Sequence, residues 1–166
     1  MDFSIGKILA ATDLSKSSME AVRHAIGLAA KFNSSLSVLH VIPHVAQEIA
    51  DCAGLECEEF LGAKQWPALA AEGLEQTSKA IEDRVRQMVE DVIREMPGCP
   101  VRILSYLIEM GNPVEKITAA ARKGKYDLVV MGTRGRTEDD TVNLGSVAAG
   151  VVRRCPKSVL VVRIPR

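Results

Sequence analysis

The chain has 166 residues, a formal net charge of zero, 47% hydrophobic residues and 25% charged residues. This length and composition suit one globular domain with a real core, spanning residues 1–166. The neutral charge balance argues against a nucleic-acid-binding surface, which is normally basic. No apolar run approaches the ~20 residues needed to span a bilayer, and the first residues lack the pattern of a signal peptide. We therefore expect a cytoplasmic protein with neither a nucleic-acid nor a membrane partner.

Five short apolar runs alternate with segments of helical periodicity. The runs cover residues 7–12, 36–42, 101–108, 128–131 and 159–162. Several lack polar and apolar alternation, as expected for strands that are buried on both faces of a parallel sheet. The strand–helix alternation predicts an α/β fold with a doubly wound parallel sheet and helices on both faces.

The helical segments follow this alternation. The first two carry apolar stripes at helical spacing, one formed by Val22, Ala25, Ile26 and Ala29 and the other by Ile81, Val85, Met88, Val89, Val92 and Met96. The third is expected to begin with Asn112 as N-cap, Pro113 in the first turn and Glu115 three residues after the cap, and to stop near Gly124. The fourth is expected to begin at residues 145–146.

Residues 44–73 show no such periodicity and are predicted to be an irregular, variable insert in the domain. This segment holds the only tryptophan, Trp66, and a set of acidic residues: Glu48, Asp51, Glu56, Glu58 and Glu59. Loops of this length are often functional. We expect the segment to present a surface to a protein partner.

Three glycines near the C-terminus carry the strongest functional signal. Gly132 and Gly135 follow the apolar run of residues 128–131, and Gly145 opens the last helix. Glycine lets a backbone approach a ligand closely, and a turn between a strand and a helix start presents N–H groups that bind phosphate. This interpretation requires residue 145 to lie beside residues 132–135. The alternative is that the glycines only form tight turns.

The spacing of these glycines, G-x2-G-x9-G-S, resembles the nucleotide-binding signature of the universal stress protein family. The resemblance covers nearly the whole chain, because segments at residues 7–13, 39–43, 127–132 and 156–163 also match in order and spacing. It implies a five-stranded sheet of order 3-2-1-4-5, similar to the adenine nucleotide alpha hydrolases. It also implies a homodimer paired through the last strand.

In ATP-binding members of that family, the residues that match Asp13 and the backbone of Val41 hold the adenine end. The loop that matches Gly132 to Gly135 and the turn that matches Gly145 to Val147 hold the ribose and phosphates, possible with Mg or Mn beside them. The resemblance thus implies these site residues: Ala11, Thr12, Asp13, Val41, Met131, Gly132, Arg134, Gly135, Gly145, Ser146 and Val147.

Two site residues allow a second role. A carboxylate at Asp13 can accept hydrogen bonds from a base amine or a ribose hydroxyl, and it can also cap the first helix. The hydroxyl of Ser146 can donate to a phosphate or cap the last helix.

The chain departs from the family pattern where Thr137 is followed by Glu138, Asp139 and Asp140. Carboxylates facing a triphosphate would repel it unless a divalent cation intervenes or the side chains point to solvent. The acidic run is therefore interpreted either as a solvated turn or as a metal site.

Three functions follow from these alternatives. The first is a non-enzymatic stress-response regulator that binds ATP or a related adenine nucleotide. The second is a slow ATPase that uses residues 138–140. The third is a nucleotide-independent interaction module whose site the acidic loop disturbs. The last strand would form a sheet edge that pairs with a second copy, unless Arg163, Pro165 and Arg166 protect that edge and leave a monomer.

Overall fold

The sheet has five parallel strands in the order β3-β2-β1-β4-β5. The computed structural model describes residues 4–43, 66–133 and 144–164. The strands are β1 (Lys7–Thr12), β2 (Ser35–Ile42), β3 (Arg102–Met110), β4 (Leu128–Gly132) and β5 (Ser158–Val162). Each strand matches a predicted apolar run to within two residues at either end, and the predicted strand order is confirmed.

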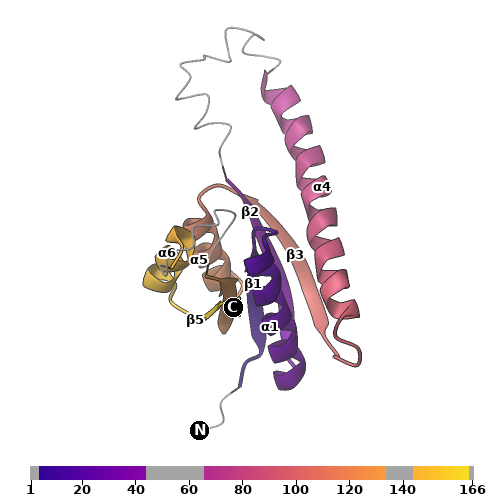
Figure 1. Cartoon of the computed structure of the whole chain (residues 1–166). Coiled ribbons are helices and arrows are strands. Elements are labelled where there is room, and N and C mark those ends of the chain that lie inside the picture. Colours follow the sequence, from indigo (N-terminus) through magenta and orange to yellow (C-terminus); the bar gives the residue numbers. More distant parts are fainter. Residues whose placement is uncertain (1–3, 44–65, 134–143, 165–166) are drawn as a thin grey trace.

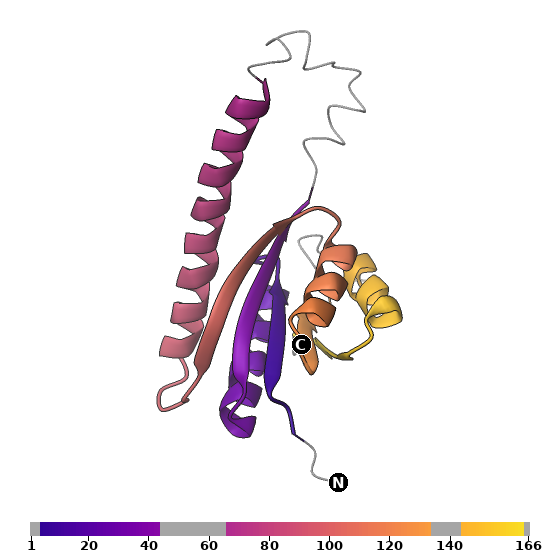
Figure 2. The same ribbon diagram turned by 180° about the vertical axis from the view of Figure 1, so that it is seen from behind.

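Helices cover both faces of the sheet, as predicted. They are α1 (Lys16–Phe32), α4 (Trp66–Arg94), α5 (Pro113–Lys123) and α6 (Ser146–Arg154). Figures 1 and 2 show α1 and α4 on one face and α5 and α6 on the other. This arrangement is the doubly wound α/β fold.

Each strand in the middle of the sheet contributes to two cores. In β1, Ile8 and Ala10 pack with α1 and α4, whereas Leu9 and Ala11 pack with α5 and α6. All five residues of β4 are buried. Burial on both faces explains why these strands lack polar and apolar alternation in the sequence.

The helix α4 begins earlier than the sequence pattern indicates. It starts at Trp66, so the prediction of an irregular insert is wrong for residues 66–73. This stretch holds three alanines, one leucine and one glutamate, which favour helix by propensity, and Pro67 is tolerated in a first helical turn. Residues 44–65 of the predicted insert lie outside the described residues.

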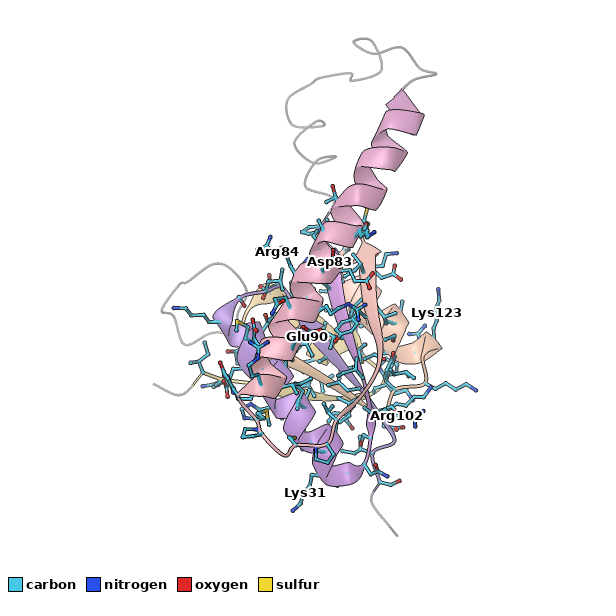
Figure 3. The ribbon with its side chains drawn as sticks, turned by 90° about the vertical axis from the view of Figure 1, so that its right-hand side faces the viewer. Lys31, Asp83, Arg84, Glu90, Arg102 and Lys123 are labelled. Atoms are coloured by element: carbon cyan, nitrogen blue, oxygen red, sulfur yellow. The ribbon has the colours of Figure 1, made fainter. Side chains whose placement is uncertain are left out.

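The outer face of α4 is charged. Figure 3 shows Asp83, Arg84 and Glu90 along this helix, and all three are exposed. Two ion pairs, Arg86 with Glu82 and Arg94 with Asp91, lie on the same helix. Figures 1 and 3 also show the N-terminal part of α4 projecting beyond the sheet. In the part of the chain that the structure describes, no helix has the length and hydropathy to cross a lipid bilayer.

The local start signals of α5 are confirmed. Asn112 is its N-cap, and its side chain accepts hydrogen bonds from the backbone N–H groups of Val114 and Glu115. The helix ends at Lys123 with Gly124 as its C-cap. The last helix also begins where predicted, at Ser146. The sequence therefore predicted the starts of both α5 and α6.

Candidate functional site

A cavity of about 320 Å³ lies at the C-terminal ends of β1, β2 and β4. This is the place where ligands bind in open α/β sheets, because the strand order reverses between β1 and β4. Strand ends and the residues after them contribute Ala11, Thr12, Asp13, Leu39, His40, Val41, Pro43, Met131, Gly132 and Thr133. Helices and their first turns contribute Ser18, Pro113, Ile117, Gly145, Ser146, Val147 and Ala148.

All of the predicted site residues that the structure describes line this cavity. The remaining two, Arg134 and Gly135, lie outside the described residues, as do Glu138, Asp139 and Asp140. The topology alone brings the strand-end residues together, since parallel strands all end at the same edge of the sheet.

Gly145 and Thr133, the residue directly after β4, meet beside the cavity. The N–H of Gly145 donates to the carbonyl oxygen of Thr133 at 2.8 Å, and the N–H of Thr133 donates to the carbonyl oxygen of Val162 in β5 at 3.0 Å. Residue 145 therefore lies next to the turn after β4, as the glycine interpretation requires. The same bond corrects one expectation, because the amide of Gly145 already has an acceptor and is not one that a ligand would use.

The first turn of α6 keeps other amides without a helical acceptor. In an α-helix the N–H groups of the first residues have no carbonyl four residues earlier, which applies here to Ser146, Val147 and Ala148. All three line the cavity. The helix macrodipole adds about 0.3–1 kcal/mol for an anion at such a terminus.

Among the described residues, no side chain caps α6. Its N-cap is Gly145, with φ −57° and ψ 151° and no side-chain hydrogen bond. Ser146 is the first helical residue and is exposed, so its interpretation as the cap of this helix is wrong. The helix start is open toward the cavity.

Gly132 has a packing role of its own. A Cβ atom added at this position would lie 2.5 Å from Oγ of Ser17 and 2.9 Å from its backbone carbonyl carbon and oxygen. Real Cβ atoms do not approach backbone this closely. Gly132 thus allows the first turn of α1 to pack on the end of β4. This packing role exists alongside its place in the cavity lining.

The interpretation of Asp13 as the cap of α1 is wrong. The N-cap is Ser15, whose side chain accepts from the N–H of Ser18. Asp13 instead supports the cap residue, because its Oδ1 accepts from the backbone N–H of Ser15 at 3.0 Å and from the Ser15 hydroxyl. Asp13 lines the cavity, and one of its carboxylate oxygens is held by Ser15.

Three polar residues of the cavity are absent from the predicted site residues: Ser18, His40 and Thr133. Oγ of Ser18 lies 2.9 Å from Oγ1 of Thr12 and accepts from the N–H of Asp13 at 3.3 Å. Nδ1 of His40 lies 2.9 Å from the carbonyl oxygen of Thr12. For Ser18, the sequence offers one signal, its position three residues after Ser15, which places it beside the start of α1. For His40, the sequence contains no sign of its contact with Thr12.

One wall of the cavity is apolar. It is formed by Leu39, Ile117, Met131 and Ala148, all from the core between the sheet and helices α5 and α6. Apolar walls with a few fixed polar groups are typical of small-molecule sites. Among the described residues, no three His, Cys, Asp or Glu side chains gather as metal ligands do.

Comparisons with known proteins agree on the family. The sequence model of the universal stress protein family matches residues 4–163. A universal stress protein of Methanocaldococcus jannaschii is 32% identical over 160 residues, covering 96% of this chain and 83% of the relative.

Two solved structures share the fold. Universal stress protein UspA from Lactobacillus plantarum has a TM-score of 0.70 at 22% identity, covering 98% of this chain and 100% of that one. A universal stress protein in complex with cAMP has a TM-score of 0.61 at 22% identity, covering 97% of this chain and 98% of that one. From the extent of the sequence match, together with the shared fold, we conclude that the chain belongs to the universal stress protein family.

Proposed function

We propose that this protein binds ATP or a related adenine nucleotide in the cavity and acts in the stress response by binding and interaction, without catalysis. The observation that carries the proposal is the hydrogen bond from Gly145 to Thr133. It holds the open start of α6 beside the turn after β4, directly over the cavity at the strand ends. A ligand with a flat apolar ring at one end and an anion at the other fits this arrangement.

The base end of the ligand would lie against the apolar wall. Leu39, Ile117 and Met131 offer surface for an adenine ring. The carboxylate of Asp13 and the backbone of Val41 stand beside that wall and can bond the base amine or a ribose hydroxyl. This arrangement would hold a nucleoside.

The phosphates would lie at the first turn of α6. The amides of Ser146, Val147 and Ala148 suit an anion, because they lack helical acceptors and lie at the positive end of the helix dipole. Arg134 and Gly135 of the glycine turn would add to this end. Mg or Mn would accompany the phosphates, bound through their oxygens.

The family adds independent support. One solved relative is a complex with cAMP, which shares its base and ribose with ATP and carries one phosphate. The cavity of this chain offers contacts for each of these parts.

We also propose a homodimer that pairs through β5. This strand is at an edge of the sheet, and an edge strand presents backbone groups that suit pairing with a second copy. Val152 and Ile164, at the end of α6 and after β5, are each 49% exposed. Light scattering during size-exclusion chromatography should give twice the chain mass of 18.0 kDa; a monomer would contradict the pairing.

The cellular location that we propose is the cytoplasm. Cys99 and Cys155 are free thiols in the described part of the chain, which suits a reducing compartment. Cell fractionation with an antibody against the protein tests this location, and recovery outside the cytoplasmic fraction would contradict it.

Thermal unfolding with and without ATP tests the binding function. A ligand at about 100 times its Kd should add about 2.7 kcal/mol to the free energy of unfolding. The variant Gly145→Val should lose this stabilisation, because a branched side chain at the helix start blocks close approach of a phosphate. The melt without ATP reports whether the variant folds.

Each other outcome has a distinct meaning. No stabilisation of the wild-type protein would favour the nucleotide-independent interaction module. Stabilisation that survives Gly145→Val would show that ATP binds elsewhere. Steady release of phosphate from bound ATP in the presence of Mg would contradict the non-enzymatic role.

A further inference from the structure

We propose that Ser18 and His40 are positioning residues that together hold the peptide group between Thr12 and Asp13 and thereby orient the Asp13 carboxylate toward the ligand. The two side chains, together with the peptide group between Thr12 and Asp13, are called the peptide clamp below. The inference rests on the proposed function at one point only, the contact between Asp13 and a nucleotide.

The clamp acts on both ends of one peptide group. The carbonyl oxygen of Thr12 accepts a hydrogen bond, so Nδ1 of His40, 2.9 Å away, must carry the proton. The N–H of Asp13, on the other side of the same peptide bond, donates to Oγ of Ser18 at 3.3 Å. Since a peptide group is planar, fixing both ends fixes the position of the Asp13 Cα atom and the plane from which its side chain departs. The two hydrogen bonds from Ser15 to Oδ1 then hold the carboxylate itself.

The clamp is buried. The relative exposure is 3% for His40, 3% for Ser18 and 6% for Thr12. Hydrogen bonds in such surroundings compete little with water, and breaking one leaves a buried polar group without a partner. The orientation of the peptide group is therefore strongly favoured.

The surrounding hydroxyls allow one consistent direction for each proton. The Ser15 hydroxyl donates to the carboxylate of Asp13, which as an ionised group can only accept. The Ser18 hydroxyl donates to the carbonyl oxygen of Ser15 at 3.0 Å. The Thr12 hydroxyl then donates to Ser18, and its oxygen accepts from the N–H of Leu14 at 3.1 Å. The hydroxyls of Thr12, Ser15 and Ser18 thus each have a defined acceptor.

The backbone of the turn shows what this network holds in place. Leu14 has φ +66°, a conformation that is disfavoured for a bulky residue. It stands directly after Asp13 and is bonded to Thr12 through its N–H. The network keeps a backbone conformation that the leucine would not adopt by itself, in the residue directly after Asp13.

The same helical turn supplies a matched control. Ser17 is also buried, at 7% exposure, but its hydroxyl has no hydrogen-bond partner, and it does not line the cavity. Ser17→Ala thus removes a neighbouring buried hydroxyl without touching the clamp.

Amide hydrogen exchange, followed by NMR without nucleotide, tests the clamp directly. Ser18→Ala should speed exchange of the Asp13 amide at least about tenfold, because that amide loses its acceptor. Ser18→Thr keeps the hydroxyl and should stay within about twofold of the wild type, as should Ser17→Ala. Unchanged exchange in Ser18→Ala would overturn the proposal, whatever the protein does with ATP.

A double-mutant cycle on ATP affinity tests the link to Asp13. By calorimetry, Ser18→Ala should raise the Kd for ATP about tenfold in the wild-type background, but by less than about twofold when Asp13 is already alanine. Binding of inorganic tripolyphosphate, which would use only the start of α6, should not change. Equal effects in both backgrounds would overturn the positioning role.

Failure of the proposed function gives a different result. If the wild-type protein does not bind ATP, the nucleotide site is wrong, and the exchange measurement still decides whether Ser18 holds Asp13. His40→Asn, which keeps an N–H close to the place of Nδ1, should preserve slow exchange of the Asp13 amide, whereas His40→Leu should speed it. Equal exchange in these two variants would overturn the role of His40.

Discussion

The two ends of the cavity are built on different principles. At the β1–α1 turn, hydrogen bonds with Ser15, Ser18 and His40 hold Asp13 and the polar groups around it. At the start of α6, no side chain from the described part of the chain caps the helix, and Gly145 provides only backbone. One end holds its side chains in place before a ligand binds, whereas the other offers amides that a ligand would complete.

The two ends of the cavity therefore require different types of residue. The β1–α1 end needs particular hydroxyls and a carboxylate at fixed positions, because side chains make its contacts. The α6 end needs small residues and a helix start, because backbone makes its contacts. Substitutions should therefore act through lost hydrogen bonds at the first end and through added atoms at the second.

The largest effect should come from adding atoms beside the glycine turn. Gly132→Val should lower the free energy of unfolding by about 3 kcal/mol, because its Cβ would collide with the backbone of Ser17. Urea denaturation measures this loss. The control Gly6→Ala adds a Cβ at an ordinary 3.4 Å from Oδ2 of Asp127 and should change stability by less than about 0.5 kcal/mol. If Gly132→Val lost less than about 1 kcal/mol, which is close to the error of such fits, the first turn of α1 would be able to shift away from the added side chain at little cost.

A carboxylate at the open helix start should separate stability from binding. Gly145→Asp should stabilise the ligand-free protein by about 0.5–1 kcal/mol, because Asp is a good N-cap and suits the helix dipole. The same carboxylate should raise the Kd for ATP about a hundredfold by occupying the amides and repelling phosphate. Calorimetry and thermal melts on one sample measure both. Tighter ATP binding would contradict the assignment of phosphates to this end.

The capped helix α5 provides the comparison for uncapped α6. Asn112→Ala should cost about 1 kcal/mol of stability, because the N–H groups of Val114 and Glu115 lose their acceptor. Urea denaturation checks this, and ATP affinity should not move since Asn112 is not among the cavity residues. A variant as stable as the wild type would mean that water replaces the cap at no cost.

The smallest effect should be a gain. Ser17→Ala should stabilise the protein by about 0.5–1 kcal/mol, because it removes a buried hydroxyl without a partner and alanine favours helix. The measurement is the urea concentration at the midpoint of unfolding, which should rise while the m-value stays unchanged. A loss of stability would indicate that the hydroxyl contributes to packing against Gly132.

The strands and the start of α5 were predictable because their signals are local. Continuous apolar runs mark strands that are buried on both faces, and Asn112 followed by Pro113 marks a helix start wherever the helix lies. The predicted site residues gather at one edge because parallel strands end there. For these features the sequence pattern and the tertiary structure agree.

The β1–α1 turn was not predictable in detail. Asp13 and Ser15 are both good N-cap residues, and the choice of Ser15 depends on the positive φ of Leu14 and on contacts with Thr12 and Ser18. The bond between His40 and Thr12 joins residues 28 positions apart. It forms because the register of β1 and β2 places these two residues side by side. The register between two strands cannot be read from the sequence alone.

An NMR titration with ATP tests the central claim, that one nucleotide spans both ends of the cavity, most directly. The account predicts that the backbone amide signals of Asp13 and Val147 shift together and saturate with a single Kd. Shifts confined to one of these amides, different apparent Kd values for the two, or no shift at either would contradict it.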